Sequence, residues 1–145
     1  MQRWISWQEV NDAIDEISNM LEISSAHIDC IVALARGGFI PAYLLSRSLD
    51  IGYLSSIGVC YGDGTRDEPK MYSAPAFHTP PTTILLVEDQ VETGCSMWFA
   101  RDTLARMTSR VVTCSLFAWE LADFKPDVVA FTTQLKGEII FPWEY

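Results

Sequence analysis

The sequence has few of the residues from which metal centres, disulfide frameworks and membrane spans are built. Its 145 residues include 4 cysteines and 2 histidines, and the cysteines form no CxxC pair and show no zinc-ligand spacing. No apolar run approaches the roughly 18 residues that a membrane span requires. The N-terminus MQRWISWQEV also lacks the apolar core of a signal peptide. We therefore expect a reduced, soluble, cytoplasmic protein with no membrane partner.

Basic residues are also scarce, with 10 lysines and arginines against 19 aspartates and glutamates and a net charge of -9. This balance argues against a nucleic-acid partner, which requires a basic face. It does not exclude phosphorylated small molecules, because backbone N–H groups at the start of a helix bind them locally. The length and the apolar fraction of 49% suit one globular domain over residues 1–145.

Apolar patterns alternate between helical and strand spacing along the chain. Ser6 and Glu9 have the spacing of a capping box, and Val10, Ile14 and Ile17 continue at helical intervals. This alternation predicts an α/β fold, a parallel twisted sheet flanked by helices. The polar segment 62–81, rich in glycine and proline, predicts a loop that is either functional or disordered. Further helices are expected near 41–49 and 96–107, and strands near 30–34, 53–61, 84–87, 111–117, 128–131 and 139–141.

An acidic pair, Glu88 and Asp89, follows the apolar run 84–87. Ligands of open parallel sheets bind beyond the carboxyl ends of the strands, where we expect this pair to lie. Two adjacent ionised carboxylates require hydroxyl donors or a cation, and sugar hydroxyls or hydrated Mg²⁺ suit them. The segment Thr93–Ser96 then offers two hydroxyls, a glycine and a helix N-terminus, features that suit a phosphate monoester.

The segment ILLVEDQVETGCS, residues 84–96, resembles the ribose-phosphate motif of type I phosphoribosyltransferases. The resemblance implies that Glu88 and Asp89 hold the ribose hydroxyls of phosphoribosyl pyrophosphate and bind Mg²⁺, directly or through water. Glu92 stands where the purine-using branch commonly has the aspartate that acts as general base, and Gln90 replaces a usual aliphatic residue. By the same resemblance the 5-phosphate would be held by Thr93, Gly94, Cys95 and Ser96.

A second motif, Arg36-Gly37-Gly38, follows the apolar run 30–34. It resembles the pyrophosphate loop of the xanthine-guanine and hypoxanthine branch of the family. Glycines let the backbone approach an oxyanion closely, and the Arg36 guanidinium can neutralise a departing pyrophosphate. The resemblance also implies a non-proline cis peptide bond at Ala35-Arg36.

The segment Val59-Cys60-Tyr61-Gly62, with the polar loop 62–81 that follows it, resembles the mobile hood that closes over the site in this family. Its Arg66 and Lys70 are either contacts of pyrophosphate or ordinary surface charges. The ending Phe141-Pro142-Trp143-Glu144 resembles the Pro-Trp-Glu or Pro-Trp-Asp ending of purine enzymes of the family.

The acceptor pocket departs from the family pattern. Trp119 occupies the position of the lysine that reads the purine, and Glu138 stands where an aromatic residue should precede Ile139. Trp119 and Ile139 are therefore the candidate contacts of the base, with Lys136 as a candidate substitute for the missing lysine. Trp119 could instead fill core space, which is the more common place for a tryptophan beside apolar strand residues.

Taken together, the resemblance implies a Mg²⁺-dependent enzyme of purine salvage, a homodimer. It would transfer a 5-phosphoribosyl group from phosphoribosyl pyrophosphate to a nucleobase, in particular a purine, and release pyrophosphate. Glu92 and Arg36 would be its catalytic residues, the first moving a proton on the base and the second stabilising the leaving group. The altered acceptor positions leave an alternative open, a non-catalytic module that binds a nucleotide or phosphoribosyl pyrophosphate.

Overall fold

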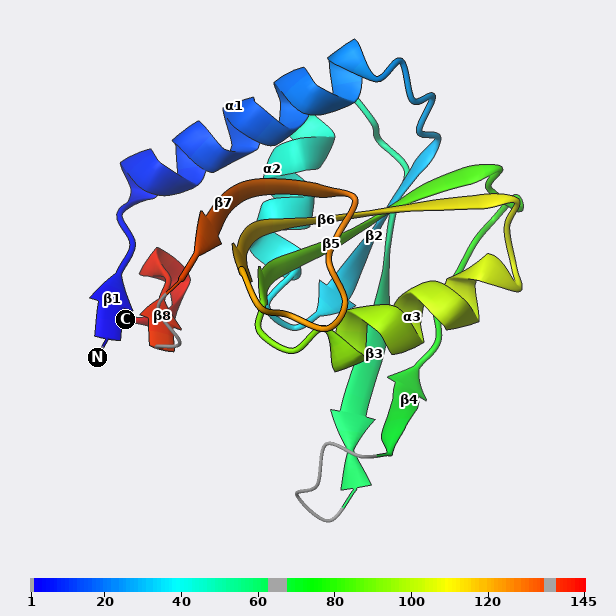
Figure 1. Ribbon diagram of the computed structural model, residues 1–145. Helices are drawn as coiled ribbons and strands as arrows, with labels where there is room; N and C mark the ends of the chain where they lie inside the picture. Colours follow the sequence, from blue (N-terminus) through cyan, green and yellow to red (C-terminus); the bar gives the residue numbers. More distant parts are fainter. Residues whose placement is uncertain (1, 63–67, 135–137) are drawn as a thin grey trace.

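Helices and strands alternate along most of the chain, as Figure 1 shows for the computed structural model, which describes residues 2–62, 68–134 and 138–145. The helices are α1 (Trp7–Ile23), α2 (Phe39–Ser48) and α3 (Cys95–Ala105), followed by a short 3-10 helix at Pro142–Glu144. The strands are β1 (Gln2–Trp4), β2 (Cys30–Ala35), β3 (Leu54–Tyr61), β4 (Pro69–Ser73), β5 (Thr83–Val91), β6 (Arg110–Trp119), β7 (Val128–Thr133) and β8 (Glu138–Ile140).

The main sheet has the strand order β4-β3-β2-β5-β6-β7, and only the edge strand β4 runs antiparallel to its neighbour. The chain passes from β2 to β3 on one side of β2, whereas β5, β6 and β7 follow on the other side. The strand order therefore reverses between β2 and β5, which pair in parallel with Ala33 opposite Val87. In open α/β sheets such a switch point opens a crevice at the carboxyl ends of the two strands.

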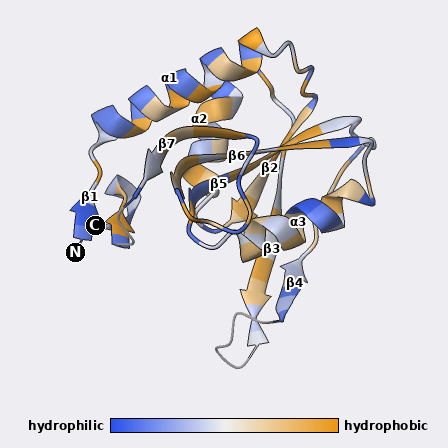
Figure 2. Cartoon of the chain, viewed as in Figure 1, coloured by the Kyte–Doolittle hydropathy of each residue, from blue (hydrophilic) through white to orange (hydrophobic). Residues whose placement is uncertain are grey.

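Both faces of the sheet are covered, which explains the continuous apolar runs of its central strands. Side chains alternate between the faces, so that Ile31 and Leu85 pack under α1 and α2 while Val32 and Leu86 pack against α3. Full burial of one such side chain contributes about 1.5–3 kcal/mol. Figure 2 shows the hydrophobic colouring of these central strands and the mixed colouring of α1. None of the described helices has the length and apolarity of a membrane span.

The predicted capping box is confirmed at the start of α1. The Ser6 hydroxyl accepts a hydrogen bond from Glu9 N at 3.2 Å, and the Glu9 carboxylate accepts one from Ser6 N at 2.9 Å. Val10, Ile14 and Ile17 lie on the buried side of the helix. The mostly parallel α/β sheet flanked by helices is likewise confirmed.

Three strand predictions need correction. Part of segment 62–81, predicted as loop, is strand β4, which pairs antiparallel with β3 through Cys60 opposite Lys70. Pro69 is tolerated at its first position because proline fits the start of an edge strand. The acidic pair lies inside β5 instead of following it, because β6 pairs with β5 as far as Val91. Strand β1 was not predicted.

Strand β1 pairs in parallel with β8 and joins the two ends of the described chain. Arg3 lies opposite Ile139, and Ile5 N donates a 2.9 Å hydrogen bond to the Ile140 carbonyl. The side chains of Gln2 and Glu138 are also joined, at 2.9 Å. Figure 1 shows this small sheet beside the main one. It holds the C-terminal segment against the carboxyl ends of the central strands.

Candidate active site

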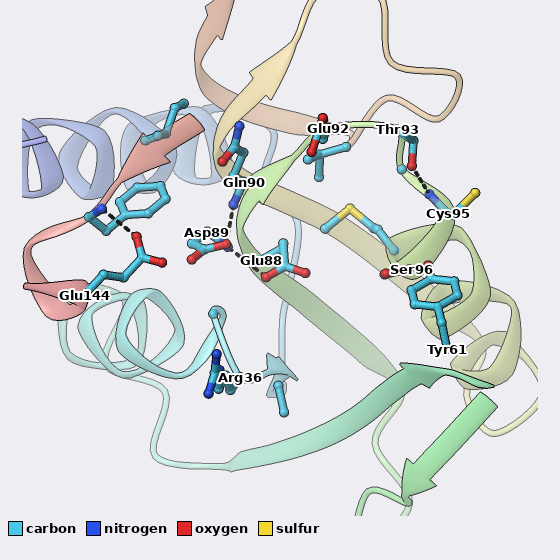
Figure 3. A pocket seen from close by; sticks show the side chains of 17 residues that line it. Arg36, Tyr61, Glu88, Asp89, Gln90, Glu92, Thr93, Cys95, Ser96 and Glu144 are labelled. Atoms are coloured by element: carbon cyan, nitrogen blue, oxygen red, sulfur yellow. Dashed lines mark hydrogen bonds between the residues drawn. The ribbon is translucent and has the colours of Figure 1, made fainter. Parts of the chain in front are cut away.

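A cleft of about 410 Å³ opens at the switch point between β2 and β5. Its walls come from the turn after β2, the end of β5, the loop before α3 and the C-terminal segment around Phe141 (Figure 3). All the site residues predicted from sequence line it except Gly38 and Trp119. Segments up to about 100 residues apart in the sequence therefore meet at one position of the sheet.

Glu88 and Asp89 form the floor of the cleft. Asp89 N lies 3.2 Å from Glu88 Oε1, and Gln90 N donates to Asp89 Oδ1 at 2.6 Å. No described lysine or arginine forms a salt bridge with either carboxyl group. The pair is therefore held by backbone N–H groups and remains accessible to a ligand from the cleft.

Burial in the folded chain shifts the pKa values of both carboxyl groups. Burial raises the pKa of Glu88 well above its ordinary value, and the charge of Asp89 raises it further. Burial also raises the pKa of Asp89, against the lowering effect of its hydrogen bonds with Glu88 and Gln90 N–H. In the absence of a ligand, burial therefore disfavours the ionised form of both carboxyl groups, that of Glu88 most strongly. A cation or a set of hydroxyl donors would reverse that preference.

The turn after β2 packs closely on the acidic pair. A side-chain carbon at Gly37 would lie only 2.5 Å from Asp89 Oδ2, so that only glycine leaves room for this carboxylate. Gly38 lies one residue further on, where a side chain would collide with the Val87 carbonyl of β5. Gly38 thus permits packing of the turn on the sheet and does not itself line the cleft. The peptide bond Ala35-Arg36 is cis, as predicted, and the exposed Arg36 lines the cleft opening.

The loop before α3 and the first residues of that helix line the cleft from Thr93 to Ser96. Gly94 has a left-handed backbone (φ 93°), and its α-carbon faces Phe124, where a side-chain carbon would lie 2.6 Å from Phe124 Cβ. Cys95 N lies 3.3 Å from Thr93 Oγ1, and the first helical hydrogen bond runs from Trp98 N to the Gly94 carbonyl. The N–H groups at this helix start, together with the helix dipole, favour an anion.

The cleft also contains residues that the sequence did not single out as contacts. Tyr61, at the end of β3, places its hydroxyl 2.7 Å from Ser96 Oγ. Gln90 and Phe141 form part of the wall, and the Glu144 carboxylate accepts a 2.7 Å hydrogen bond from Phe141 N. Sequence signals existed for Gln90, as a departure from the family motif, and for Glu144, in the Pro-Trp-Glu ending. Tyr61 belonged to the segment that resembles the start of the hood, but its contact with Ser96, 35 residues away, could not be predicted from local sequence.

Trp119 ends β6 outside the residues that line the cleft, whereas Ile139 lines it. Trp119 is thus not among the residues that could contact a base bound in this cleft as its lining is described. Arg66 and Lys136, two further candidates, lie outside the described residues. Lys70 is in β4 and does not line the cleft.

Comparison with known proteins places this geometry in a family. The xanthine-guanine phosphoribosyltransferase of Gluconobacter oxydans is 31% identical over 79% of this chain and 67% of its own length. The enzyme of the same name from Idiomarina loihiensis is 29% identical over 97% of this chain and 86% of its own. A purine phosphoribosyltransferase structure from Pyrococcus horikoshii superposes with a TM-score of 0.85 at 26% identity, over 99% of this chain and 94% of that one. No protein-family model matches the sequence.

The sheet with its switch-point cleft, acidic pair and helix-start loop defines the fold of a type I phosphoribosyltransferase. Within that class, the chain belongs to the xanthine-guanine phosphoribosyltransferase family.

Proposed function

We propose that the chain transfers a 5-phosphoribosyl group from phosphoribosyl pyrophosphate to a ring nitrogen of a purine base and releases pyrophosphate. The observation that carries this proposal is the meeting of three groups in one cleft: the Glu88-Asp89 pair, the Thr93–Ser96 loop and the Arg36-Gly37 turn. Each suits a different part of the donor substrate. A ribose that carries phosphate groups at two positions would need a contact for each of these parts, and the three groups supply such contacts.

The donor would be held from both ends. The N–H groups and hydroxyls of Thr93–Ser96 suit the 5-phosphate, and the Glu88-Asp89 carboxyls suit the 2- and 3-hydroxyls of the ribose. The Gly37 backbone and the Arg36 guanidinium would face the pyrophosphate. Because the transition state resembles an oxocarbenium ion, positioning and charge stabilisation of the leaving group are the main tasks of the site.

The carboxyl pair also fits Mg²⁺ bound together with the substrate. The described residues contain no group of three or more His, Cys, Asp or Glu side chains that could hold a metal. Mg²⁺ nevertheless binds through one or two carboxylates together with substrate phosphates. Glu88 and Asp89 would hold it, directly or through water. The ion would neutralise charge on the leaving pyrophosphate.

The acceptor base would occupy the part of the cleft between Glu92 and the C-terminal segment. Glu92 lines the cleft there and is the candidate to manage the proton on the ring nitrogen. Ile139 and Phe141 add apolar surface to the cleft lining. Glu92 reaches one methylene further than the aspartate usual in the family.

A second function is favoured by one specific observation, the absence of Trp119 from the cleft lining together with the exposed Glu138 in place of an aromatic residue. A chain with such an acceptor end could bind phosphoribosyl pyrophosphate or a nucleotide without turnover. Tight binding without pyrophosphate release is the signature of this non-catalytic module.

The two functions are separated by one assay. The purified chain is incubated with phosphoribosyl pyrophosphate, Mg²⁺ and xanthine, guanine, hypoxanthine or adenine, and nucleotide and pyrophosphate are measured. Formation of a nucleoside monophosphate with one of these bases establishes the transferase. Binding of phosphoribosyl pyrophosphate by calorimetry, with no product from any base, establishes the binding module.

We further propose that the enzyme acts in purine salvage in the cytoplasm as a homodimer. Sedimentation equilibrium gives the oligomeric state directly, since the mass of one chain is 16.3 kDa. A monomeric mass across the working concentration range would contradict the dimer.

A further inference from the structure

Tyr61, the last residue of β3, contacts Ser96 in the first turn of α3. Its hydroxyl oxygen lies 2.7 Å from Ser96 Oγ, a hydrogen-bond distance for two hydroxyls. Both residues line the cleft, and Figure 3 shows the Tyr61 ring beside Ser96. A direct contact thus connects the sheet to a hydroxyl of the proposed phosphate site.

The backbone of this loop is fixed independently of Tyr61. Asp123 N and Phe124 N donate to the Thr93 carbonyl at 3.1 and 3.3 Å, and Phe124 also packs on Gly94. These contacts come from the connection between β6 and β7 and do not involve Tyr61. The Tyr61 contact therefore acts on the Ser96 side chain and not on the path of the backbone.

The direction of this hydrogen bond decides what Ser96 can offer to a ligand. A hydroxyl carries one hydrogen and two acceptor lone pairs. If Ser96 donates to Tyr61, it has no hydrogen left for an anion in the cleft. If Tyr61 donates to Ser96, the Ser96 hydrogen is free to point at a phosphate oxygen. A phosphate, as a charged acceptor, forms the stronger hydrogen bond and selects the second arrangement.

We propose that Tyr61 is a positioning residue for the 5-phosphate and acts through Ser96. The Tyr61 hydroxyl donates a hydrogen bond to Ser96, and the Ser96 hydroxyl donates one to the phosphate. This inference rests on the proposed function, because it assigns the anion at Thr93–Ser96 to the 5-phosphate of phosphoribosyl pyrophosphate. Tyr61 touches Ser96 and holds its hydroxyl in the orientation in which its hydrogen faces the ligand.

The test compares Tyr61→Phe, which keeps the ring and removes only the hydroxyl, with the unmodified chain. Loss of one neutral hydrogen bond to a bound ligand corresponds to roughly a 3- to 10-fold change in affinity. We expect KM for phosphoribosyl pyrophosphate to rise by about this factor while kcat stays within about twofold. The reason is that the contact with the 5-phosphate is the same in the bound substrate and in the transition state. Ser96→Ala should raise KM at least as much, and the double variant should match Ser96→Ala.

Tyr53→Phe is the matched control, because the Tyr53 hydroxyl is also hydrogen-bonded, to the Thr79 carbonyl at 2.7 Å, but lies outside the cleft. It should lower thermal stability without changing KM. An unchanged KM in Tyr61→Phe, or additive effects of Tyr61→Phe and Ser96→Ala, would overturn the inference.

Failure of the proposed function gives a different result. A chain that forms no nucleotide yet binds phosphoribosyl pyrophosphate refutes the transferase, and the same 3- to 10-fold loss is then expected in the calorimetric Kd of Tyr61→Phe. An unchanged Kd overturns the positioning role. Absence of any binding by the unmodified chain overturns both proposals.

Discussion

Glu88 is a carboxyl group held where ionisation is unfavourable in the absence of a ligand. Burial raises its pKa, so the unfolded chain releases this proton at a lower pH than the folded chain does. The free energy of unfolding therefore falls as pH rises from the ordinary carboxyl pKa towards the raised one. Such a group lowers the stability of the fold, and perturbed carboxyl pKa values of this kind are common at active sites.

The first prediction follows from this sign. Glu88→Gln removes the ionisable group while keeping its shape, so it should raise Tm, and the gain should grow between pH 5 and pH 8. Thermal unfolding with EDTA present measures this, and the variant should also bind phosphoribosyl pyrophosphate more weakly. Glu120→Gln, at an exposed position, is the control. A gain in Tm that is constant or shrinks with pH would contradict the assignment.

The cysteines differ enough in environment to act as chemical probes. Cys60 and Cys95 are exposed, whereas Cys30 and Cys114 are buried, and burial together with the charge of Asp29 raises the pKa of Cys30 to about 11. The thiolate is the reactive form, so the buried pair should react slowly. Cys95 begins α3 and lines the cleft, so an adduct there would occupy the proposed phosphate site.

We therefore expect iodoacetamide at pH 8 to modify Cys60 and Cys95 first and to inactivate the chain through Cys95. Phosphoribosyl pyrophosphate should slow the inactivation. Peptide mass mapping against residual activity measures both effects. Cys60→Ala should lose activity at the same rate as the unmodified chain, and Cys95→Ala should keep its own starting activity. Rapid inactivation of Cys95→Ala would show that another thiol controls the loss.

At the level of single residues, the sequence predicted what depends on local order along the chain. The acidic pair, the Thr93–Ser96 loop and the Arg36-Gly37 turn are contiguous motifs, and all line the cleft. Tyr61 was missed as a contact because it acts through a partner 35 residues away. Trp119 was assigned by its place in an alignment of strands, which does not fix the wall that its side chain faces.

Among the secondary-structure elements, Asp29 links the beginnings of two strands. Its carboxylate accepts hydrogen bonds from Thr82 N at 2.9 Å and Thr83 N at 2.7 Å, joining the residue before β2 to the start of β5. Burial opposes ionisation of Asp29, but these N–H donors outweigh it and hold its pKa below the ordinary value. These two hydrogen bonds fix the relative register of β2 and β5, the two strands that form the cleft.

Asp29→Asn should destabilise the chain by about 1–3 kcal/mol at pH 7, because an amide supplies one acceptor where the carboxylate supplies two. A group with a lowered pKa stabilises the fold above its unfolded pKa, and the contribution is lost as pH falls through the folded pKa. The difference between variant and unmodified chain should therefore shrink in acid. Urea unfolding at pH 7 and pH 3 measures it, with the exposed Asp12→Asn as control. A difference that is equal at both pH values would contradict the stabilising role of the Asp29 carboxylate.

The elements that sequence predicted are those with long periodic patterns. Helix α1 has apolar residues at helical intervals. The buried strands β2, β5 and β6 carry short continuous apolar runs. Strand β4 was missed because all but its first residue are exposed, so no alternation marks it, and pairing with β3 alone makes it a strand. Strand β1 is three exposed residues stabilised by a partner near the other end of the chain.

For the molecule as a whole, alternation of strands and helices was sufficient to predict a parallel sheet with helices on both faces. It could not give the strand order, because pairing depends on contacts between distant segments. The reversal between β2 and β5 is visible only in the structure, and it is this reversal that places the two motifs on one cleft.

The pairing of β1 with β8 predicts a selective effect on the acceptor base. Deleting residues 2–4 removes the strand that supports the segment carrying Ile139 and Phe141. We expect KM for the purine to rise several-fold while KM for phosphoribosyl pyrophosphate changes little, because the donor contacts lie on β2, β5 and α3. Steady-state kinetics with each substrate varied in turn tests this. Trp4→Ala, which leaves the backbone pairing in place, is the control, and equal increases in both constants would contradict the assignment.

The same pairing has a consequence for biosynthesis. Gln2 leaves the ribosome early, but its partner Glu138 is added only 136 residues later. The central strands can associate during translation, so the donor half of the cleft forms first. The wall that carries Ile139 and Phe141 is completed only after β8 has been synthesised, later than the central strands.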